Sequence, residues 1–294
     1  MKVSIIDIGT QSLKHYIFEV EGSQKKLLHY KRYSEANLGE SDSLSKETID
    51  RTIKILNECL LANQELKVIK LEIVGTEILR KARNASDFTS VVKELSGKDI
   101  QIISQDQEAL YLYQGFIKII PPDLSFAAMN IGGGSTEVVI GNNLELVQST
   151  KIPFGVKFMK KNFSAESGMD WKRIDEYLAQ NITLDSHVEN IFVTGVLDFI
   201  SAVGPHLGFI FEKCSIPNHP IKFTMEKYEE FLDILRNTSI DDLKKLYPKD
   251  PGYADNFAIG QSVYVAIARK LSAVTIIPSN NDLTDGVIHQ MLVK

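Results

Sequence analysis

Cysteine, tryptophan and long apolar segments are scarce in this sequence. Its 294 residues include two cysteines and one tryptophan. Cys59 and Cys214 lie far apart, and only His219 lies near Cys214, so we expect neither a disulfide framework nor a zinc site. No apolar run approaches the ~18 residues that a membrane-spanning helix needs, and the N-terminus shows no signal-peptide pattern. The sequence therefore predicts a cytoplasmic protein with no membrane partner.

Positive charge is not in excess either. The formal net charge is −5, and the six histidines are scattered, with no pair at metal-ligand spacing. We therefore expect no DNA partner, and only structural or surface histidines. The chain is 44% hydrophobic and 24% charged, which suffices for two ordinary cores, and its length favours two domains.

The stretch 129–140 carries the strongest functional signal. An apolar segment runs into three glycines and then resumes, which predicts two strands joined by a glycine-rich loop. Glycines let the backbone approach a ligand closely, so successive N–H groups can face an anion. Taken alone, the loop is equally consistent with an ordinary hairpin turn. The candidate phosphate-binding residues are Gly133, Gly134, Ser135 and Thr136, flanked by the oxygen-bearing side chains of Asn130 and Glu137.

The N-terminal stretch 5–12 repeats this pattern. An apolar segment leads to an acidic residue, Ile-Gly, and then small hydroxyl and amide residues before another apolar segment. The repeat indicates two related α/β halves, each bringing a phosphate-binding hairpin to a shared cleft. Asp7 corresponds to Asn130, and the candidate phosphate-binding residues here are Gly9, Thr10, Gln11 and Ser12.

Periodicity and turn residues predict the remaining elements. Pro121-Pro122 cannot continue the helix expected at 105–119, so the pair marks a domain boundary and a hinge. Ser45 and Thr224 are expected to cap helices, and Gly97 to end one. Strands are expected at 3–6, 13–20, 27–33, 68–74, 100–104, 125–131, 137–140, 144–151, 190–193 and 273–277, and turns at 21–23 and 141–143. Helices are expected around 49–60 and at 88–95, 170–180, 225–237, 257–271 and 285–293.

Several motifs, in order along the chain, resemble those of the exopolyphosphatase and guanosine pentaphosphate phosphohydrolase (Ppx/GppA) family. This family lies within the acetate and sugar kinase, heat-shock 70 and actin superfamily. The matching stretches are Asp7-Ile-Gly-Thr-Gln-Ser12, 74–88, 102–109, 130–137 and Ile152-Pro-Phe-Gly155.

The resemblance implies the fold of that superfamily, an α/β protein with two ribonuclease H-like (actin-like ATPase) domains and a cleft between them. We expect the N-terminal domain at 1–120 and the C-terminal domain at 121–279. By the same resemblance, a closing helix at about 280–294 packs on the first domain.

The resemblance also implies a reaction, which is release of the terminal phosphate from inorganic polyphosphate or guanosine pentaphosphate by metal-assisted attack of water. Glu108 matches the glutamate that the family uses to activate this water, and Arg80 matches an arginine directed at phosphate. Asp7, Asn130 and Glu137 stand at the metal-ligand positions, so Mg²⁺ is the expected cofactor. The resemblance leaves a homodimer open.

Several residues depart from the family pattern, and these departures bear on whether the protein is catalytically active. Asn130 replaces an aspartate, and an amide lacks the charge that attracts a divalent cation, so we expect weaker metal binding. Only Gly195 remains of a glycine pair on the nucleoside side, which disfavours ATP-dependent kinase activity. Tyr253 replaces a common arginine, so a contact to a nucleotide or a phosphate chain is expected to be missing. Gln11 and Thr10 are milder replacements. Two functions stay open: a phosphohydrolase, or a catalytically weakened regulatory protein that binds polyphosphate or a nucleotide.

Overall fold

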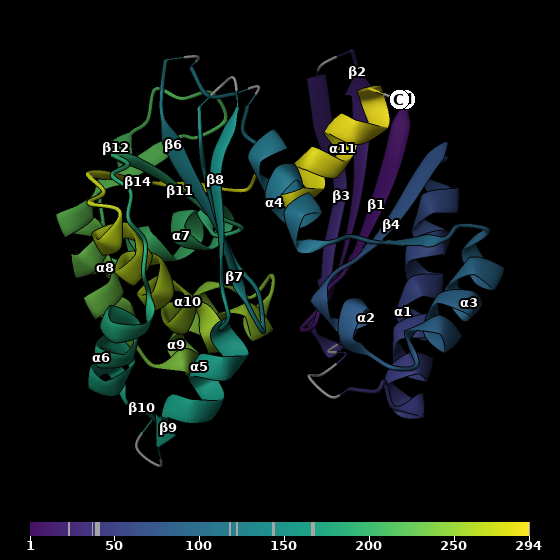
Figure 1. Cartoon of the computed structure of the whole chain (residues 1–294), viewed down its shortest axis with the longest axis horizontal. Coiled ribbons are helices and arrows are strands. Elements are labelled where there is room, and N and C mark those ends of the chain that lie inside the picture. The colour runs from purple at the N-terminus through teal and green to yellow at the C-terminus, as the bar shows by residue number, and fades with distance from the viewer. Residues whose placement is uncertain are drawn as a thin grey trace. The chain divides into compact units, whose positions relative to one another are not determined.

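The computed structural model describes residues 1–22, 24–36, 38, 42–117, 119–121, 123–142, 145–165 and 168–293. Contacts divide the chain into two units, Met1–Glu108 and Ala109–Lys294, both of which mix helices and strands (Figure 1). This agrees with the predicted α/β class. The predicted turns at 21–23 and 141–143 and the proline pair each include a residue outside the described ones, namely Ser23, Asn143 and Pro122.

The first unit is built on a five-stranded sheet in the order β3-β2-β1-β4-β5. β1 runs antiparallel to β2 and parallel to β4, and Asp7 pairs with Lys14 on one side and with Val74 on the other. The strands are β1 (Lys2–Ile8), β2 (Leu13–Glu21), β3 (Gln24–Tyr33), β4 (Lys70–Gly75) and β5 (Ile100–Ile102); the helices are α1 (Lys46–Glu65), α2 (Glu77–Lys81) and α3 (Ala85–Ser96), with a 3₁₀ turn at Ser34–Ala36.

Local sequence explains where these helices begin and end. The Ser45 hydroxyl accepts the Thr48 N–H at 3.1 Å and caps α1, as predicted. Gly97 ends α3 in the left-handed conformation, with φ of 67°. The apolar stripes of α1 and α3 pack on the strands, and Ile6, Leu56 and Phe88 share one buried core.

The second unit is built on a seven-stranded sheet in the order β12-β13-β14-β11-β6-β7-β8. Its strands are β6 (Phe126–Ile131), β7 (Thr136–Gly141), β8 (Leu146–Ile152), β11 (Asn190–Thr194), β12 (Glu212–Lys213), β13 (Ile221–Thr224) and β14 (Thr275–Ser279), and β9 (Ser164–Ala165) pairs with β10 (Gly168–Met169). Its helices are α5 (Val156–Phe163), α6 (Trp171–Asn181), α7 (Leu197–Val203), α8 (Met225–Asn237), α9 (Ile240–Leu246), α10 (Pro251–Lys270) and α11 (Leu283–Val293), with a 3₁₀ turn at Gly204–Leu207.

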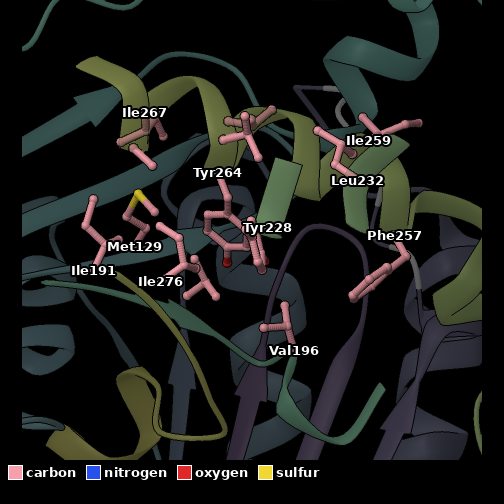
Figure 2. Packing of buried hydrophobic residues seen from close by; sticks show 14 of the residues in the cluster. Met129, Ile191, Val196, Tyr228, Leu232, Phe257, Ile259, Tyr264, Ile267 and Ile276 are labelled. Carbon is pink, nitrogen blue, oxygen red and sulfur yellow. The ribbon is translucent and has the colours of Figure 1, made fainter. Parts of the chain in front are cut away.

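Each face of this sheet carries its own apolar core. On one face, Met129 and Ile191 of the strands pack with Tyr264 and Ile267 of α10 (Figure 2). On the other face, Ala128 and neighbouring strand residues pack with side chains that follow Glu108 in the chain. A sheet with both faces buried explains why β6 and β11 are apolar throughout most of their length.

The structure divides the chain earlier than the boundary predicted after residue 120. α4 (Gln105–Gln114) begins in the first unit, but Leu112 and Phe116 are buried against Phe126 and Phe192 of the second sheet. Apolar burial of this segment therefore assigns residues after Glu108 to the second unit.

The closing helix packs on this same segment. A Cβ built on Gly286 of α11 would lie 2.0 Å from the Tyr111 carbonyl oxygen, so the backbones of α11 and α4 approach closely. The Gln290 amide also donates to the Gln114 amide oxygen at 3.0 Å. The closing helix was predicted to pack on the first domain, at 1–120. The residues that it contacts, Tyr111 and Gln114, lie within that range, but the structure assigns them to the second unit.

Several elements differ in extent from their predictions, among them α4, α10 and β14. α4 ends at Gln114 instead of near residue 119, because the Asn281 amide donates to the Gly115 carbonyl at 3.0 Å and the chain turns there. α10 begins at Pro251, where a proline at the first helical position sacrifices no hydrogen bond. β14 continues through Pro278. A proline is tolerated there because the pairing with β13 stops at Ile276, so β13 needs no N–H from this residue. Within the described ranges, none of the helices has the length and apolar character needed to cross a bilayer.

Candidate functional site

The hairpin β6–β7 places the second glycine motif at the end of a central strand. Asn130 and Glu137 are cross-strand partners, so their side chains emerge on the same face of the sheet. The loop between them is closed by the Gly132 N–H, which donates to the Ser135 carbonyl at 2.8 Å. The loop thus projects beyond the sheet from a fixed base.

Helix α5 fixes the orientation of this loop. The Val156 N–H donates to the Gly132 carbonyl at 3.1 Å, and the Lys157 N–H donates to the Gly133 carbonyl at 3.0 Å. In a trans peptide the N–H lies opposite the carbonyl, so the N–H groups of Gly133 and Gly134 point away from α5. These two N–H groups can therefore converge on an anion, as predicted for the motif.

Gly155 makes this arrangement feasible. A Cβ at this position would lie 2.2 Å from the Gly132 carbonyl oxygen and 2.8 Å from that of Gly133. Its φ of −141° and ψ of −164° are open to any residue, so glycine is needed for the close approach alone. The motif Ile152-Pro-Phe-Gly155 is therefore a brace for the glycine loop.

The two hydroxyl residues of the motif have different surroundings. The Ser135 hydroxyl donates to Glu137 Oε1 at 2.7 Å, at the base of the loop. The Thr136 side chain is fully buried and donates to the Phe154 carbonyl at 2.9 Å. The predicted role of Thr136 in phosphate binding would therefore fall to its backbone, because strand alternation turns its hydroxyl toward the brace and away from the Asn130–Glu137 face.

Asn130 is engaged by a residue that the sequence analysis missed. The Thr194 hydroxyl donates to Asn130 Oδ1 at 3.1 Å, and Thr194 ends the parallel strand β11 beside β6. Ser279 of β14 is the next partner in the same row. The carboxyl ends of parallel strands share one edge, and this rule could have identified Thr194 and Ser279 from the sequence.

The first hairpin, β1–β2, repeats the closure of the second. The Gly9 N–H donates to the Ser12 carbonyl at 3.0 Å, as Gly132 does to Ser135. The internal repeat inferred from sequence therefore extends to the hydrogen bonds of the loops. Thr10 and Ser12 are buried, and Gln11 and Gly9 are half-buried.

Two basic residues adjoin this first hairpin. Lys14 Nζ lies 3.6 Å from Asp7 Oδ2, and the Arg32 Nε–H donates to the Ser12 hydroxyl at 3.2 Å. Both follow from register, since Lys14 pairs with Asp7 on one side and with Arg32 on the other. The sequence analysis missed both residues, and cross-strand pairing was the signal that could have found them.

Glu108 and Arg80 lie together in the first unit. Arg80 Nη2 is 3.1 Å from Glu108 Oε2, and Arg80 Nη1–H donates to the Ile103 carbonyl. Only 6% of Glu108 is exposed. Ser104 caps the start of α4, where its N–H donates to Gln107 Oε1 at 2.8 Å and its hydroxyl accepts the Gln107 N–H at 3.2 Å. Glu108 is therefore held at the start of α4 by a planar, fixed guanidinium.

The predicted metal ligands come from both units. Asp7 belongs to the first unit, and Asn130 and Glu137 belong to the second. No cluster of three or more histidine, cysteine, aspartate or glutamate side chains in the described ranges is arranged to hold a metal ion. Mg²⁺ usually binds through one or two carboxylates, with water and substrate phosphate completing its shell, and Asp7 and Glu137 fit that donor type.

In the predicted nucleoside-side motif, Gly195 and Asp198 are both engaged by hydrogen bonds from other residues. Gly195 has a left-handed φ of 70°, and the Tyr253 hydroxyl donates to its carbonyl at 2.7 Å. Asp198 accepts from Lys249 at 2.9 Å and from the Asn280 amide at 2.7 Å. Burial alone would raise the pKa of Asp198, but these two hydrogen bonds outweigh it and lower the pKa.

Comparison with known proteins identifies relatives of the chain. A sequence profile of the Ppx/GppA phosphatase family matches residues 16–294. A guanosine-5'-triphosphate,3'-diphosphate pyrophosphatase of Photobacterium profundum is 32% identical over 162 residues, which cover 54% of this chain and 33% of that protein. A protein of the same name from Aliivibrio fischeri is 28% identical over 177 residues, covering 59% and 36%. The chain thus spans about a third of the length of the curated relatives it matches.

Solved structures resemble the whole chain. The Ppx/GppA family member of Aquifex aeolicus has a TM-score of 0.81 at 22% identity, covering 100% of this chain and 98% of that one. An exopolyphosphatase from Cytophaga hutchinsonii has a TM-score of 0.84 at 18% identity, with the same coverage. At these identities the likeness concerns the fold, and it confirms the predicted α/β fold with two actin-like domains.

Proposed function

Because the chain belongs to the Ppx/GppA phosphatase family, whose members are phosphoanhydride hydrolases, we propose that it releases the terminal phosphate from inorganic polyphosphate or guanosine pentaphosphate. The braced glycine loop of the second hairpin is the observation that carries this proposal. Its carbonyl groups are held by α5, and the outward N–H groups of Gly133 and Gly134 suit phosphate oxygens.

Glu108 and Arg80 supply the groups for attack of water. Glu108 accepts a proton from the water as it attacks the terminal phosphorus, and the leaving phosphate chain takes up the electron pair of the broken P–O bond. Arg80 orients the Glu108 carboxylate through Oε2 and offers a planar donor for phosphate oxygens. The contact between them makes Arg80 a positioning residue for Glu108.

For Mg²⁺, Glu137 offers a carboxylate in the second unit and Asp7 offers one in the first. The ion would neutralise charge on the phosphate chain when it is bound. The Ser135 hydroxyl holds Glu137 Oε1 at 2.7 Å, so the orientation of this carboxylate is set by the loop itself. Binding at the loop and the position of the carboxylate are therefore coupled.

A regulatory protein that binds phosphate chains is the second candidate. Asn130 favours it, because the second hairpin lacks the negative charge that an aspartate would add to a metal site. This candidate keeps the braced loop and predicts binding without turnover.

Phosphate release by the purified protein separates the two candidates. Polyphosphate and guanosine pentaphosphate are offered in turn, with Mg²⁺ and with a chelator, and we expect release only with Mg²⁺. Glu108→Gln should keep binding but reduce the rate by about 10²–10⁴, since it removes the proton acceptor at nearly constant size.

Asp106→Asn is the matched control for Glu108→Gln. Asp106 is exposed in the same first turn of α4, so this variant removes the same charge from the same helix end. Its rate should be unchanged. Equal rates for Glu108→Gln and the natural protein would refute the water-activating role, and no release from either substrate would favour the regulatory candidate.

A further inference from the structure

Position 130 lies between two side chains of different character. On the β11 side, the Thr194 hydroxyl contacts Asn130 just beyond the pair Val193–Met129, and on the β7 side Glu137 pairs with Asn130 across the hairpin. Thr194 is 4% exposed, and its own carbonyl accepts the Tyr264 hydroxyl of α10 at 3.2 Å. The hydroxyl that contacts Asn130 is therefore anchored by the sheet and by α10.

The contact sets the orientation of the Asn130 amide. The Thr194 hydroxyl donates to Oδ1 at 3.1 Å, and this is the hydrogen bond that the Asn130 side chain makes within the described ranges. With the oxygen directed toward β11, the NH₂ group is directed away from it. An amide nitrogen donates two hydrogen bonds and cannot ligate a cation.

Charge supports the same assignment. An aspartate at position 130 would face Glu137 directly across the hairpin, and two adjacent carboxylates repel unless a cation lies between them. The asparagine removes this repulsion, so the hairpin needs no cation to hold its shape. The neighbouring loop already offers the outward N–H groups of Gly133 and Gly134 as anion donors.

We propose that Asn130 is a hydrogen-bond donor to a phosphate oxygen of the substrate chain, not a metal ligand, and that Thr194 is its positioning residue. This inference rests on the proposed phosphate-chain substrate. It implies that the second hairpin binds a phosphate chain in the absence of divalent metal, and that Glu137 is the carboxylate this hairpin offers to Mg²⁺.

Calorimetric titration with inorganic tripolyphosphate in the presence of EDTA tests the proposal on the full chain. The natural protein should bind. Asn130→Asp replaces the donor with a negative charge and should weaken binding at least tenfold, while a parallel magnesium titration shows tighter Mg²⁺ binding. Thr194→Val releases the amide and should weaken tripolyphosphate binding about three- to tenfold, whereas Thr194→Ser keeps the hydroxyl and should restore it.

A double variant distinguishes positioning from general damage to the fold. In the Asn130→Asp background, Thr194→Val should have little further effect on tripolyphosphate binding, because the group it orients is gone. Thermal unfolding of each variant checks that it folds. If Thr194→Val does not fold, the single variants Asn130→Asp and Thr194→Ser carry the test.

Three outcomes would overturn the proposal: no binding by the natural protein in EDTA, equal or tighter binding by Asn130→Asp, or equal weakening by the serine and valine variants at position 194. Phosphate release measured with Mg²⁺ keeps this result separate from the proposed function. If phosphate is released with Mg²⁺ but Asn130→Asp leaves tripolyphosphate binding in EDTA unchanged, only this inference is defeated. The expected binding pattern without any release defeats the hydrolase and leaves the inference standing.

Discussion

Replacing Gly155 by alanine should displace the glycine loop of the second hairpin. The new Cβ would lie 2.2 Å and 2.8 Å from the carbonyl oxygens of Gly132 and Gly133, and both are backbone atoms that cannot rotate aside. The loop must therefore move by about 1 Å, which strains the hydrogen bonds from Val156 and Lys157.

The magnitude follows from these contacts. Overpacking costs about 1–3 kcal/mol, and each of the two weakened hydrogen bonds adds up to about 1 kcal/mol, so we expect a loss of about 1–5 kcal/mol. In a unit of this size each kcal/mol lowers Tm by about 2–4 °C, so Tm should fall by about 2–20 °C. Misplaced N–H groups should also weaken tripolyphosphate binding about tenfold, equivalent to about 1.4 kcal/mol.

Calorimetric melting and tripolyphosphate titration measure both effects, with Gly260→Ala as the matched control. Gly260 lies in α10, and a Cβ there would meet Val156 Cγ1 at an ordinary 3.7 Å. This control should keep binding and gain up to about 1 kcal/mol, because alanine favours a helix. If Gly155→Ala matches the natural protein in Tm and in affinity, the brace does not set the loop.

Two further predictions concern stability. Burial, opposed by the hydrogen bond that His15 makes to the Asn63 amide oxygen, lowers the pKa of His15 from 6.5 to about 4, so the folded state excludes a proton that the unfolded chain binds. The contribution of this group to the free energy of unfolding is complete above pH 6.5 and falls by about 3 kcal/mol as the pH drops to 4. Urea unfolding across that range should show a smaller loss of stability for His15→Gln than for His187→Gln, the control that alters an exposed histidine. Arg236 makes two hydrogen bonds to Asp175, at 2.9 Å and 2.6 Å, and Arg236→Lys should cost about 1–2 kcal/mol in thermal melts because lysine cannot bind bidentately. An unchanged Tm for Arg236→Lys would show that this pair contributes nothing.

Sequence alone was enough for the local features of this protein. The glycine hairpins, the caps at Ser45 and Thr224 and the helix end at Gly97 were all predicted correctly, because each depends on a few neighbouring residues. The motif order also predicted the family and the α/β fold. Shared descent preserves such motifs in order along a chain, whatever the rest of the sequence does.

Tertiary structure decided which atoms these motifs present. Two strands, β7 and β8, separate Gly155 from the glycine loop in the chain, and only folding brings its backbone against Gly132. Thr194 reaches Asn130 because β11 and β6 are neighbours in the sheet, a pairing between residues far apart in the chain. The direction of the Thr136 hydroxyl depends on folding for the same reason, since its partner is the Phe154 carbonyl. A sequence states which donors and acceptors exist, whereas their direction depends on long-range pairing and packing, which no local pattern encodes.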